Sequence, residues 1–307
     1  MKLKLSSLFI LMGLFLFAQE KAHTSQNISI NNLIDGTLLT PNDVSKPNLV
    51  IIIAGSGPTD RDGNQNFLMS NTLKKLALGI TKEKTATFRY DKRIVKQIRK
   101  GNVDKDILFD DFVTDAISVI EYFKNTKKYN RIYVAGHSQG SLVGLLAAKG
   151  RADGFISLAG AGQSIDKVIT EQVIKTAPMF TEDTKRIFDI LRVGKTTSDY
   201  PQALGSIFSK DIQPFMANWM SYDPQKEIKK LEMPILIING TKDLQVSETE
   251  AKLLDTAANE STLIIVEKMN HILVHIEGDD LENSKSYNEA YRKLSPKLLE
   301  AITSFVK

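Results

Sequence analysis

The chain has 307 residues, of which 42% are hydrophobic and 25% charged, and its formal net charge is +4. This length and composition are typical of one large globular domain and exclude a fibrous, low-complexity or disordered chain. The small net charge, without a stripe of interleaved basic and aromatic residues, argues against a nucleic-acid partner, and the absence of cysteine excludes disulfides and a thiol nucleophile.

The first residues have the pattern of an export signal. Two lysines precede the apolar run 5–17, and Ala18 offers a cleavage site before polar residues. The apolar run is too short for a convincing membrane-spanning helix, although a signal anchor is the alternative. We expect residues 1–18 to be a signal peptide. Residues 19–307 would then be exported, to the periplasm or the medium, as a single domain with no stable membrane insertion.

Strand and helix candidates alternate over the first half of the chain. Asp35-Gly36 is a strong turn signal between two short runs, which predicts a β-hairpin. The β-branched runs that follow lack the two-residue alternation of half-exposed strands, as expected for strands covered on both faces. This order predicts an α/β fold with a mostly parallel central sheet and helices on both faces. We expect hairpin strands at 27–33 and 36–40, later strands at 48–54, 84–90, 131–135 and 154–159, and helices at 70–80, 106–123 and 141–149.

Residues 163–231 interrupt this alternation, because they contain several helical segments with large apolar side chains and no strand candidate. We interpret them as a helical cap inserted into the single domain, at the carboxyl edge of the sheet where ligands of α/β proteins bind. Further core helices packed against the sheet are the alternative. The alternation then resumes, with strands expected at 234–239 and 262–266 and helices at 247–258 and 286–306.

The sequence Gly-His-Ser-Gln-Gly (136–140) joins a predicted strand directly to a predicted helix. In this context Gly-x-Ser-x-Gly indicates a nucleophile elbow, a sharp turn that holds a serine at strained backbone angles. The glycines are needed because side chains at their positions would keep the strand and the helix apart. Ser138 is therefore the candidate nucleophile. A glycine-rich turn with an incidental serine is the alternative.

A serine hydroxyl needs a base within hydrogen-bond reach, and the chain has four histidines. His23 lies beside the export signal, and His137 precedes Ser138 in the elbow, where we expect it to pack. His271 follows the last predicted strand in a loop, whereas His275 lies deeper in an apolar segment. We therefore assign the base to His271, with His275 as the alternative.

The acid that orients this base should follow the preceding strand. Asp243 does so, in the loop after the predicted strand 234–239, although an exposed turn aspartate would look the same. The order Ser138, Asp243, His271 is the order of α/β-hydrolases and differs from that of the other serine-triad folds. Three residue types in this order, each after a strand, are harder to obtain by chance than one motif.

The tetrahedral oxyanion of an acyl transfer needs two backbone donors. One should be the amide of Gln139, the residue after the nucleophile. The other should come from the glycine-rich loop after the strand 48–54, where we choose the amide of Ser56.

A metal site is the competing interpretation of the histidines. His271 and His275 have the i, i+4 spacing of a zinc-binding pair, but Ile272 stands where such a motif needs glutamate, and no third ligand is evident. We therefore expect neither a metal nor a cofactor.

Charged residues gather in two further segments. Residues 60–62 could touch substrate, but we expect them to form a structural ion-pair network with residues 89–93. The densest basic run, 92–100, has the spacing of one solvated face.

Five segments together are similar to one known family. They are Gly-Ser-Gly-Pro-Thr-Asp-Arg-Asp-Gly-Asn (55–64), Arg-Tyr-Asp-Lys-Arg (89–93), Gly-His-Ser-Gln-Gly (136–140), Gly-Thr-Lys-Asp-Leu-Gln-Val (240–246) and Met-Asn-His-Ile-Leu (269–273). These segments resemble the EstD-like bacterial carboxylesterases of the α/β-hydrolase superfamily, which are grouped with serine aminopeptidase-like proteins. The resemblance spans roughly residues 28–306. It implies an esterase for short to medium acyl esters with Ser138, Asp243 and His271 as its triad.

The sequence thus predicts an exported serine esterase that acts on a small-molecule ester through an acyl-enzyme. A serine aminopeptidase is one alternative, and it would need a carboxylate in the cap for the free amino terminus of its substrate. Glu171, Glu182 and Asp183 are the candidates. A non-catalytic binding protein of hydrolase ancestry is the other alternative, although such a protein has no need of a complete triad. The oligomeric state is left open.

Overall fold

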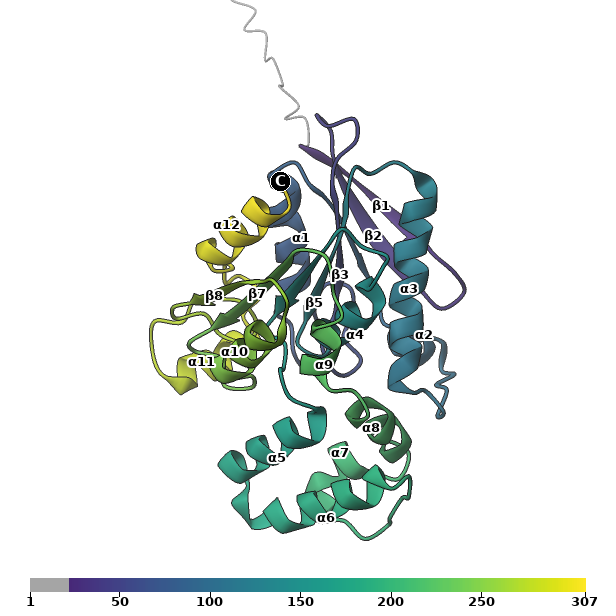
Figure 1. Cartoon of the computed structure of the whole chain (residues 1–307), viewed down its shortest axis with the longest axis vertical. Coiled ribbons are helices and arrows are strands. Elements are labelled where there is room, and N and C mark those ends of the chain that lie inside the picture. Colours follow the sequence, from purple (N-terminus) through teal and green to yellow (C-terminus); the bar gives the residue numbers. More distant parts are fainter. Residues whose placement is uncertain (1–21) are drawn as a thin grey trace, which may run out of the picture.

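The computed structural model describes residues 22–307, which are built around one eight-stranded sheet (Figure 1). The strands are β1 (His23–Ser29), β2 (Asp35–Pro41), β3 (Leu49–Ile53), β4 (Ala86–Tyr90), β5 (Ile132–His137), β6 (Gly154–Leu158), β7 (Ile235–Gly240) and β8 (Thr262–Val266). Their order across the sheet is β1-β2-β4-β3-β5-β6-β7-β8. The predicted signal peptide, 1–18, lies outside the described residues.

The pairing of the strands confirms the predicted mostly parallel sheet. β1 runs antiparallel to β2, and β2 antiparallel to β4, whereas every later pair from β4 to β8 is parallel. Parallel neighbours need a crossover between them, and helices provide these crossovers. The carboxyl ends of β3, β5, β6, β7 and β8 therefore meet at one edge of the sheet.

Helices cover both faces of the sheet, and the buried strands supply side chains to both cores. In β3, Leu49, Ile51 and Ile53 enter one apolar core, whereas Val50 and Ile52 enter the other. This explains why the strand lacks a polar alternation in the sequence. The first core is closed by α3 (Phe109–Thr126), α4 (Gln139–Ala148), α9 (Pro224–Ile228) and α10 (Glu248–Ala257), and the second by α1 (Thr72–Lys82) and α12 (Pro296–Phe305).

The helices after β6 form a separate layer, drawn below the sheet in Figure 1. They have their own apolar core, in which the rings of Phe188 and Phe208 lie 4.9 Å apart. The layer contacts the body at the start of α3, where Trp219 stacks on Phe109 with 5.5 Å between ring centroids. None of the helices in residues 22–307 is long and apolar enough to cross a membrane. The layer comprises α5 (Ile165–Thr176), α6 (Thr181–Arg192), α7 (Gly205–Phe208), α8 (Gln213–Met220) and the short 3₁₀ helices Pro178–Phe180 and Gln202–Leu204.

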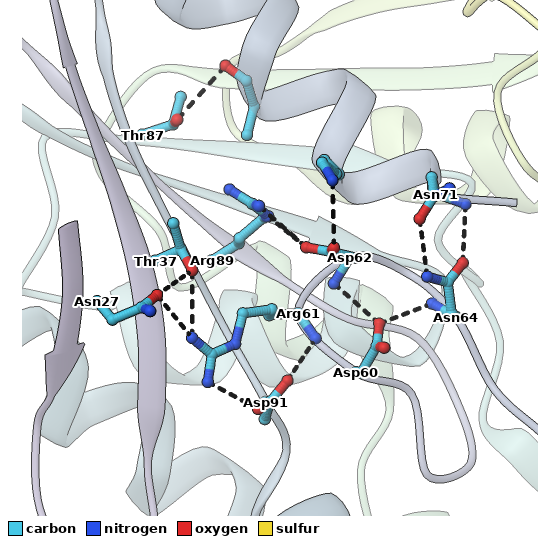
Figure 2. Close-up of polar contacts among 12 residues, drawn as sticks. Asn27, Thr37, Asp60, Arg61, Asp62, Asn64, Asn71, Thr87, Arg89 and Asp91 are labelled. Carbon is cyan, nitrogen blue, oxygen red and sulfur yellow. Dashed lines mark hydrogen bonds and ion pairs between the residues drawn. The ribbon is translucent and has the colours of Figure 1, made fainter. Parts of the chain in front are cut away.

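The predicted ion-pair network between residues 60–62 and 89–93 is confirmed. The Arg61 guanidinium pairs with Asp91 at 2.8 Å, and that of Arg89 pairs with Asp62 at 2.9 Å (Figure 2). Asp60 caps the turn by accepting from the backbone amides of Asp62 and Asn64, both at 2.9 Å. The network therefore fixes the loop after β3 against the end of β4.

The turn of the predicted hairpin lies elsewhere. Asp35 and Gly36 belong to β2 itself, where they pair with Ser29 and Ile28. The chain reverses at residues 30–34, where the Asn31 side chain accepts from two backbone amides. A Cβ on Gly36 would come within 2.1 Å of the Phe88 ring, so the glycine serves close packing and not the turn.

The predicted single helix 286–306 is wrong. The chain instead forms α11 (Asp280–Ser286), an irregular segment, and α12, which begins at Pro296. A proline suits the first turn of a helix but disfavours helical angles in the residue before it, and Ser295 is accordingly extended at φ −57° and ψ 127°.

The basic run 92–100 is only partly a solvated face. Residues 93–100 form α2 (Arg93–Lys100), whose exposed side carries Arg99 and Lys100. Lys92 and Arg93, however, are buried, with 5% and 8% of their surface exposed. The first two residues of this basic run therefore lie in the interior, and the last two lie in solvent.

Candidate active site

Ser138 sits at the sharp turn between β5 and α4. Its backbone angles, φ 54° and ψ −122°, are rare for a residue with a side chain. A Cβ on Gly136 would lie 2.0 Å from the carbonyl oxygen of Gly140, and one on Gly140 would lie 2.5 Å from that of Ile53. Only glycines fit at these two positions. The predicted elbow is therefore present, and it presents Ser138 at the carboxyl edge of the sheet.

His271 and Asp243 form a buried pair at the same edge. His271 Nδ1 lies 2.8 Å from Asp243 Oδ2, and the two side chains are 6% and 0% exposed. Asp243 Oδ1 accepts from the backbone amides of Gln245 and Val246 at 2.8 and 2.9 Å. Because a carboxylate only accepts, His271 Nδ1 carries a hydrogen, and Nε2 of the neutral ring is left with its lone pair.

Buried amide side chains hold the two loops that carry this pair. Asn270 donates to Asn283 Oδ1 at 2.8 Å and to Ser286 Oγ at 2.9 Å, and its own Oδ1 accepts from the amide of Val274. Asn283 in turn donates to the carbonyl of Lys242 at 2.7 Å. Asn283 thus joins the loop of Asp243 to that of His271. No local sequence signal indicates this connection, because the partners are far apart in the chain.

His137 packs in the elbow, as predicted, and contacts the loop of the proposed base. Its Nε2 donates to the carbonyl of His271 at 2.8 Å, and the two rings are 5.0 Å apart. Loss of hydration, with a smaller contribution from nearby His271, lowers the pKa of His137 from 6.5 to about 4. His275, the alternative base, instead bonds exposed Glu277 at 2.7 Å and does not contact Asp243.

The lowered pKa of His137 predicts a loss of stability in acid. Below about pH 6.5 the unfolded chain binds a proton at this residue, whereas the folded chain does so only near its own pKa of about 4. This part of the stability is complete above pH 6.5 and disappears as the pH falls towards 4. In urea unfolding, the difference in free energy of unfolding between the wild type and His137→Gln should therefore become smaller as the pH falls. A difference in free energy of unfolding that stays constant from about pH 7 to about pH 4.5 would contradict this.

The two proposed oxyanion donors lie with Ser138 around one cavity. The cavity has a volume of about 770 Å³, and Ser56, Ser138 and Gln139 all line it. An ideal Cβ on Gly55 would lie 3.2 Å from Ser138 Cβ, so the glycine-rich loop is adjacent to the nucleophile. Ser56 itself is held by its carbonyl, which accepts from the Thr59 hydroxyl at 2.7 Å and from the Gln65 amide.

The wall of the cavity is mostly apolar and comes from both the body and the helical layer after β6. Gln245 and Val246, whose backbone amides donate to Asp243, also line the cavity. The His271–Asp243 pair is therefore adjacent to residues of the cavity wall. Its apolar lining includes Phe112 and Leu142 from the body and Ile165, Val168, Phe215 and Trp219 from that layer.

None of the three carboxylates considered for an aminopeptidase lines this cavity. Glu171 accepts from the Gln163 side chain, Glu182 pairs with Lys185, and Asp183 pairs with Arg186. Asp104 and Asp211 are the carboxylates among its lining residues.

This sheet order, with a serine at the turn after β5, defines an α/β-hydrolase fold. Among solved structures, Est1E from Butyrivibrio proteoclasticus superposes with a TM-score of 0.56 at 18% identity, covering 91% of this chain and 98% of that one. A dienelactone hydrolase from Anabaena variabilis superposes with a TM-score of 0.52 at 13% identity, covering 93% and 98%. The predicted fold class is confirmed.

The chain is also similar in sequence to Esterase EstD of Thermotoga maritima. The two are 24% identical over 279 residues, which cover 85% of this chain and 63% of that protein. The chain thus spans less than two thirds of this relative's length. No protein-family model matches the chain. The resemblance to EstD that the five sequence segments indicate is confirmed.

Proposed function

We propose that the protein is a serine hydrolase that cleaves carboxylic esters through an acyl-enzyme, with Ser138, His271 and Asp243 as its triad. The observation that carries this proposal is the 2.8 Å contact between His271 and Asp243, at the edge of the sheet where the elbow presents Ser138. The hydrogen bond from His137 to the carbonyl of His271 supports it, because it ties the neighbour of the nucleophile to the loop of the base.

The mechanism follows from these roles. His271 Nε2 accepts the proton of Ser138 Oγ as the oxygen attacks the ester carbonyl, and the carbonyl π electrons move to oxygen. The resulting imidazolium gives its proton to the leaving alcohol as the ester bond breaks. His271 then takes a proton from water, which attacks the acyl-enzyme and releases the acid and free Ser138. Asp243 orients the imidazole and stabilises its charged form throughout.

The backbone amides of Ser56 and Gln139 are the proposed donors to the oxyanion. Both residues line the cavity with Ser138, and Gln139 is the first residue of α4, whose positive end favours negative charge. A developing charge in a mostly apolar cavity depends strongly on such donors. The proposal assigns the two amides this role and gives none to the Ser56 hydroxyl.

The cavity favours an ester with an apolar acyl or alcohol group. Its volume of about 770 Å³ and its aromatic and aliphatic lining suit a short to medium chain. An aminopeptidase would need a carboxylate placed for a substrate ammonium. The three residues first considered for this task are engaged elsewhere, and Asp104 and Asp211 are the carboxylates that line the cavity. The similarity to Esterase EstD and the mostly apolar lining favour the esterase, in which the layer α5–α8 acts as a cap over the substrate.

The experiment that tests this function is a substrate panel. Purified protein should hydrolyse p-nitrophenyl esters of about two to eight acyl carbons and leave aminoacyl p-nitroanilides intact. Turnover of the anilides without the esters would favour the aminopeptidase, and failure on both, with no covalent labelling by a fluorophosphonate, would favour the binding protein.

We further propose that residues 1–18 direct export, as the order of basic, apolar and small residues indicates. Expression of the full chain in a bacterial host, followed by fractionation and mass measurement, tests this. A product that begins near residue 19 and lies outside the cytoplasm is expected. An uncleaved product in the cytoplasm would contradict it.

A further inference from the structure

Lys92 is a buried lysine that the mechanism above does not use. It lies between the end of β4 and the start of α2, and 5% of its surface is exposed. Its Nζ donates to the carbonyl of Gly55 at 3.0 Å and to Gln139 Oε1 at 2.8 Å. The same nitrogen lies 4.2 Å from the centre of the Phe112 ring. Lys92 also lines the cavity that contains Ser138.

Burying this amine costs stability, and the fold alone does not need it. Within residues 22–307 no carboxylate forms an ion pair with Lys92, and burial lowers its pKa to about 7. An apolar residue of similar volume would fill the same space at lower cost. Two neutral oxygens and an aromatic ring offset the cost only in part. A costly buried group that lines the same cavity as a candidate nucleophile indicates a role in the site.

The two oxygens bound by Lys92 belong to the oxyanion loop and to the residue after the nucleophile. The described peptide bonds are all trans, so the N–H of Ser56 points away from the Gly55 carbonyl of the same peptide unit. A bond from Lys92 to that carbonyl therefore fixes the direction of the Ser56 amide. The second bond holds the side chain of Gln139, whose backbone amide is the other proposed donor.

The residues before and after Lys92 in the chain are both held by ion pairs. Asp91 accepts from Arg61 at 2.8 Å and from Arg99 at 2.7 Å. Arg93 makes a two-pronged bond to buried Asp115, at 2.7 and 2.8 Å. The backbone of Lys92 is thus held by an ion pair before it and another after it. The ion pairs of residues 91 and 93 thus hold the Lys92 amine where it bonds both Gly55 and Gln139.

We propose that Lys92 is a positioning residue that orients both backbone donors of the oxyanion hole, the Ser56 amide through Gly55 and the Gln139 amide through its side chain. This inference rests on the proposed function. Donation to two oxygens needs only two hydrogens on Nζ, so Lys92 holds both donors whether it is charged or neutral.

Lys92→Met tests the inference, because methionine keeps the volume and removes the donor. We expect kcat/KM for p-nitrophenyl butyrate to fall about 100-fold, mainly through kcat, since the lost stabilisation acts on the transition state. A trifluoromethyl ketone offers a second measurement. Ser138 Oγ adds to its carbonyl, the serine proton moves to His271, and the carbonyl electrons form an oxyanion between the two amides. Its inhibition constant should rise in proportion to the loss of kcat/KM.

The secondary alcohol of the same carbon skeleton fills the cavity but forms no oxyanion, so its inhibition constant should change by less than about threefold. Lys96→Met is the matched control. Lys96 lies one turn further along α2, pairs with Asp35 at 2.7 Å and contacts neither oxyanion residue. Its variant should behave as the wild type does in all three measurements.

A folded Lys92→Met protein with wild-type kcat/KM, or with equal loss of affinity for ketone and alcohol, would overturn the inference. If this variant does not fold, Gln139→Met carries the test. This variant keeps the backbone amide of residue 139 and removes the oxygen that accepts from Lys92. The inhibition constant of the ketone should rise about tenfold while that of the alcohol stays unchanged. An unchanged inhibition constant of the ketone would overturn the inference. A wild type that neither hydrolyses esters nor reacts with a fluorophosphonate would overturn the proposed function and this inference together.

Discussion

Ser138→Ala should lower kcat/KM for p-nitrophenyl butyrate by about 10⁵-fold or more, leaving only the rate that binding and oxyanion stabilisation provide. The alanine methyl group occupies the same strained position, at φ 54°, but supplies no nucleophile. Stability should be nearly unchanged, because within residues 22–307 no hydrogen bond of the Ser138 hydroxyl supports the fold. Steady-state rates and thermal unfolding of the purified variant measure both effects.

Ser118→Ala is the matched control for this substitution. Ser118 lies on α3, and its hydroxyl donates only to the Thr114 carbonyl within the helix. Its activity should equal that of the wild type. Ser138→Ala activity within tenfold of the wild type, in a preparation free of host esterases, would show that the elbow serine is not the nucleophile.

Asp243→Asn should have the second largest effect, a loss of about 10⁴-fold in kcat with the fold intact. Asp243 Oδ1 accepts from the amides of Gln245 and Val246, so the oxygen of an asparagine keeps that place and its NH₂ group faces His271. The imidazole must then accept at Nδ1 and carry its hydrogen on Nε2. In that tautomer Nε2 cannot take the proton of Ser138.

Asp279→Asn provides the comparison. Asp279 likewise accepts from two backbone amides through Oδ1, those of Leu281 and Glu282, but it has no histidine partner. Its asparagine variant should keep full activity and similar stability, because asparagine also caps helices well. Equal activities of Asp243→Asn and Asp279→Asn would mean that Asp243 does not orient the base.

The sequence predicts the scaffold, the elbow and the contact between His271 and Asp243, because their signals are local. The edge strand β8 is predicted with its observed limits, and β3 is one residue shorter at each end than predicted. The elbow is a run of five residues whose geometry demands glycine at two of them. His271 and Asp243 are found because each follows a strand whose carboxyl end meets that of β5.

Other features depend on contacts that no local pattern shows. The burial of Lys92 requires the loop after β3, the start of α4 and Phe112 of α3 to converge on one nitrogen. Asn283 bonds Asn270, 13 residues away in the chain, and Lys242, 41 residues away, and only the fold brings the two loops together. The break before α12 is different, since Pro296 is visible in the sequence and marks the start of that helix.

The central claim is that Ser138 is a nucleophile activated by His271. The most direct measurement is peptide mapping by mass spectrometry after reaction with a fluorophosphonate, for the wild type and for His271→Gln. The account predicts one adduct, on the Ser138 side chain, formed in the wild type and slowed by at least about 10³-fold in the variant. An adduct on another residue, or equal rates of labelling in the two proteins, would contradict it.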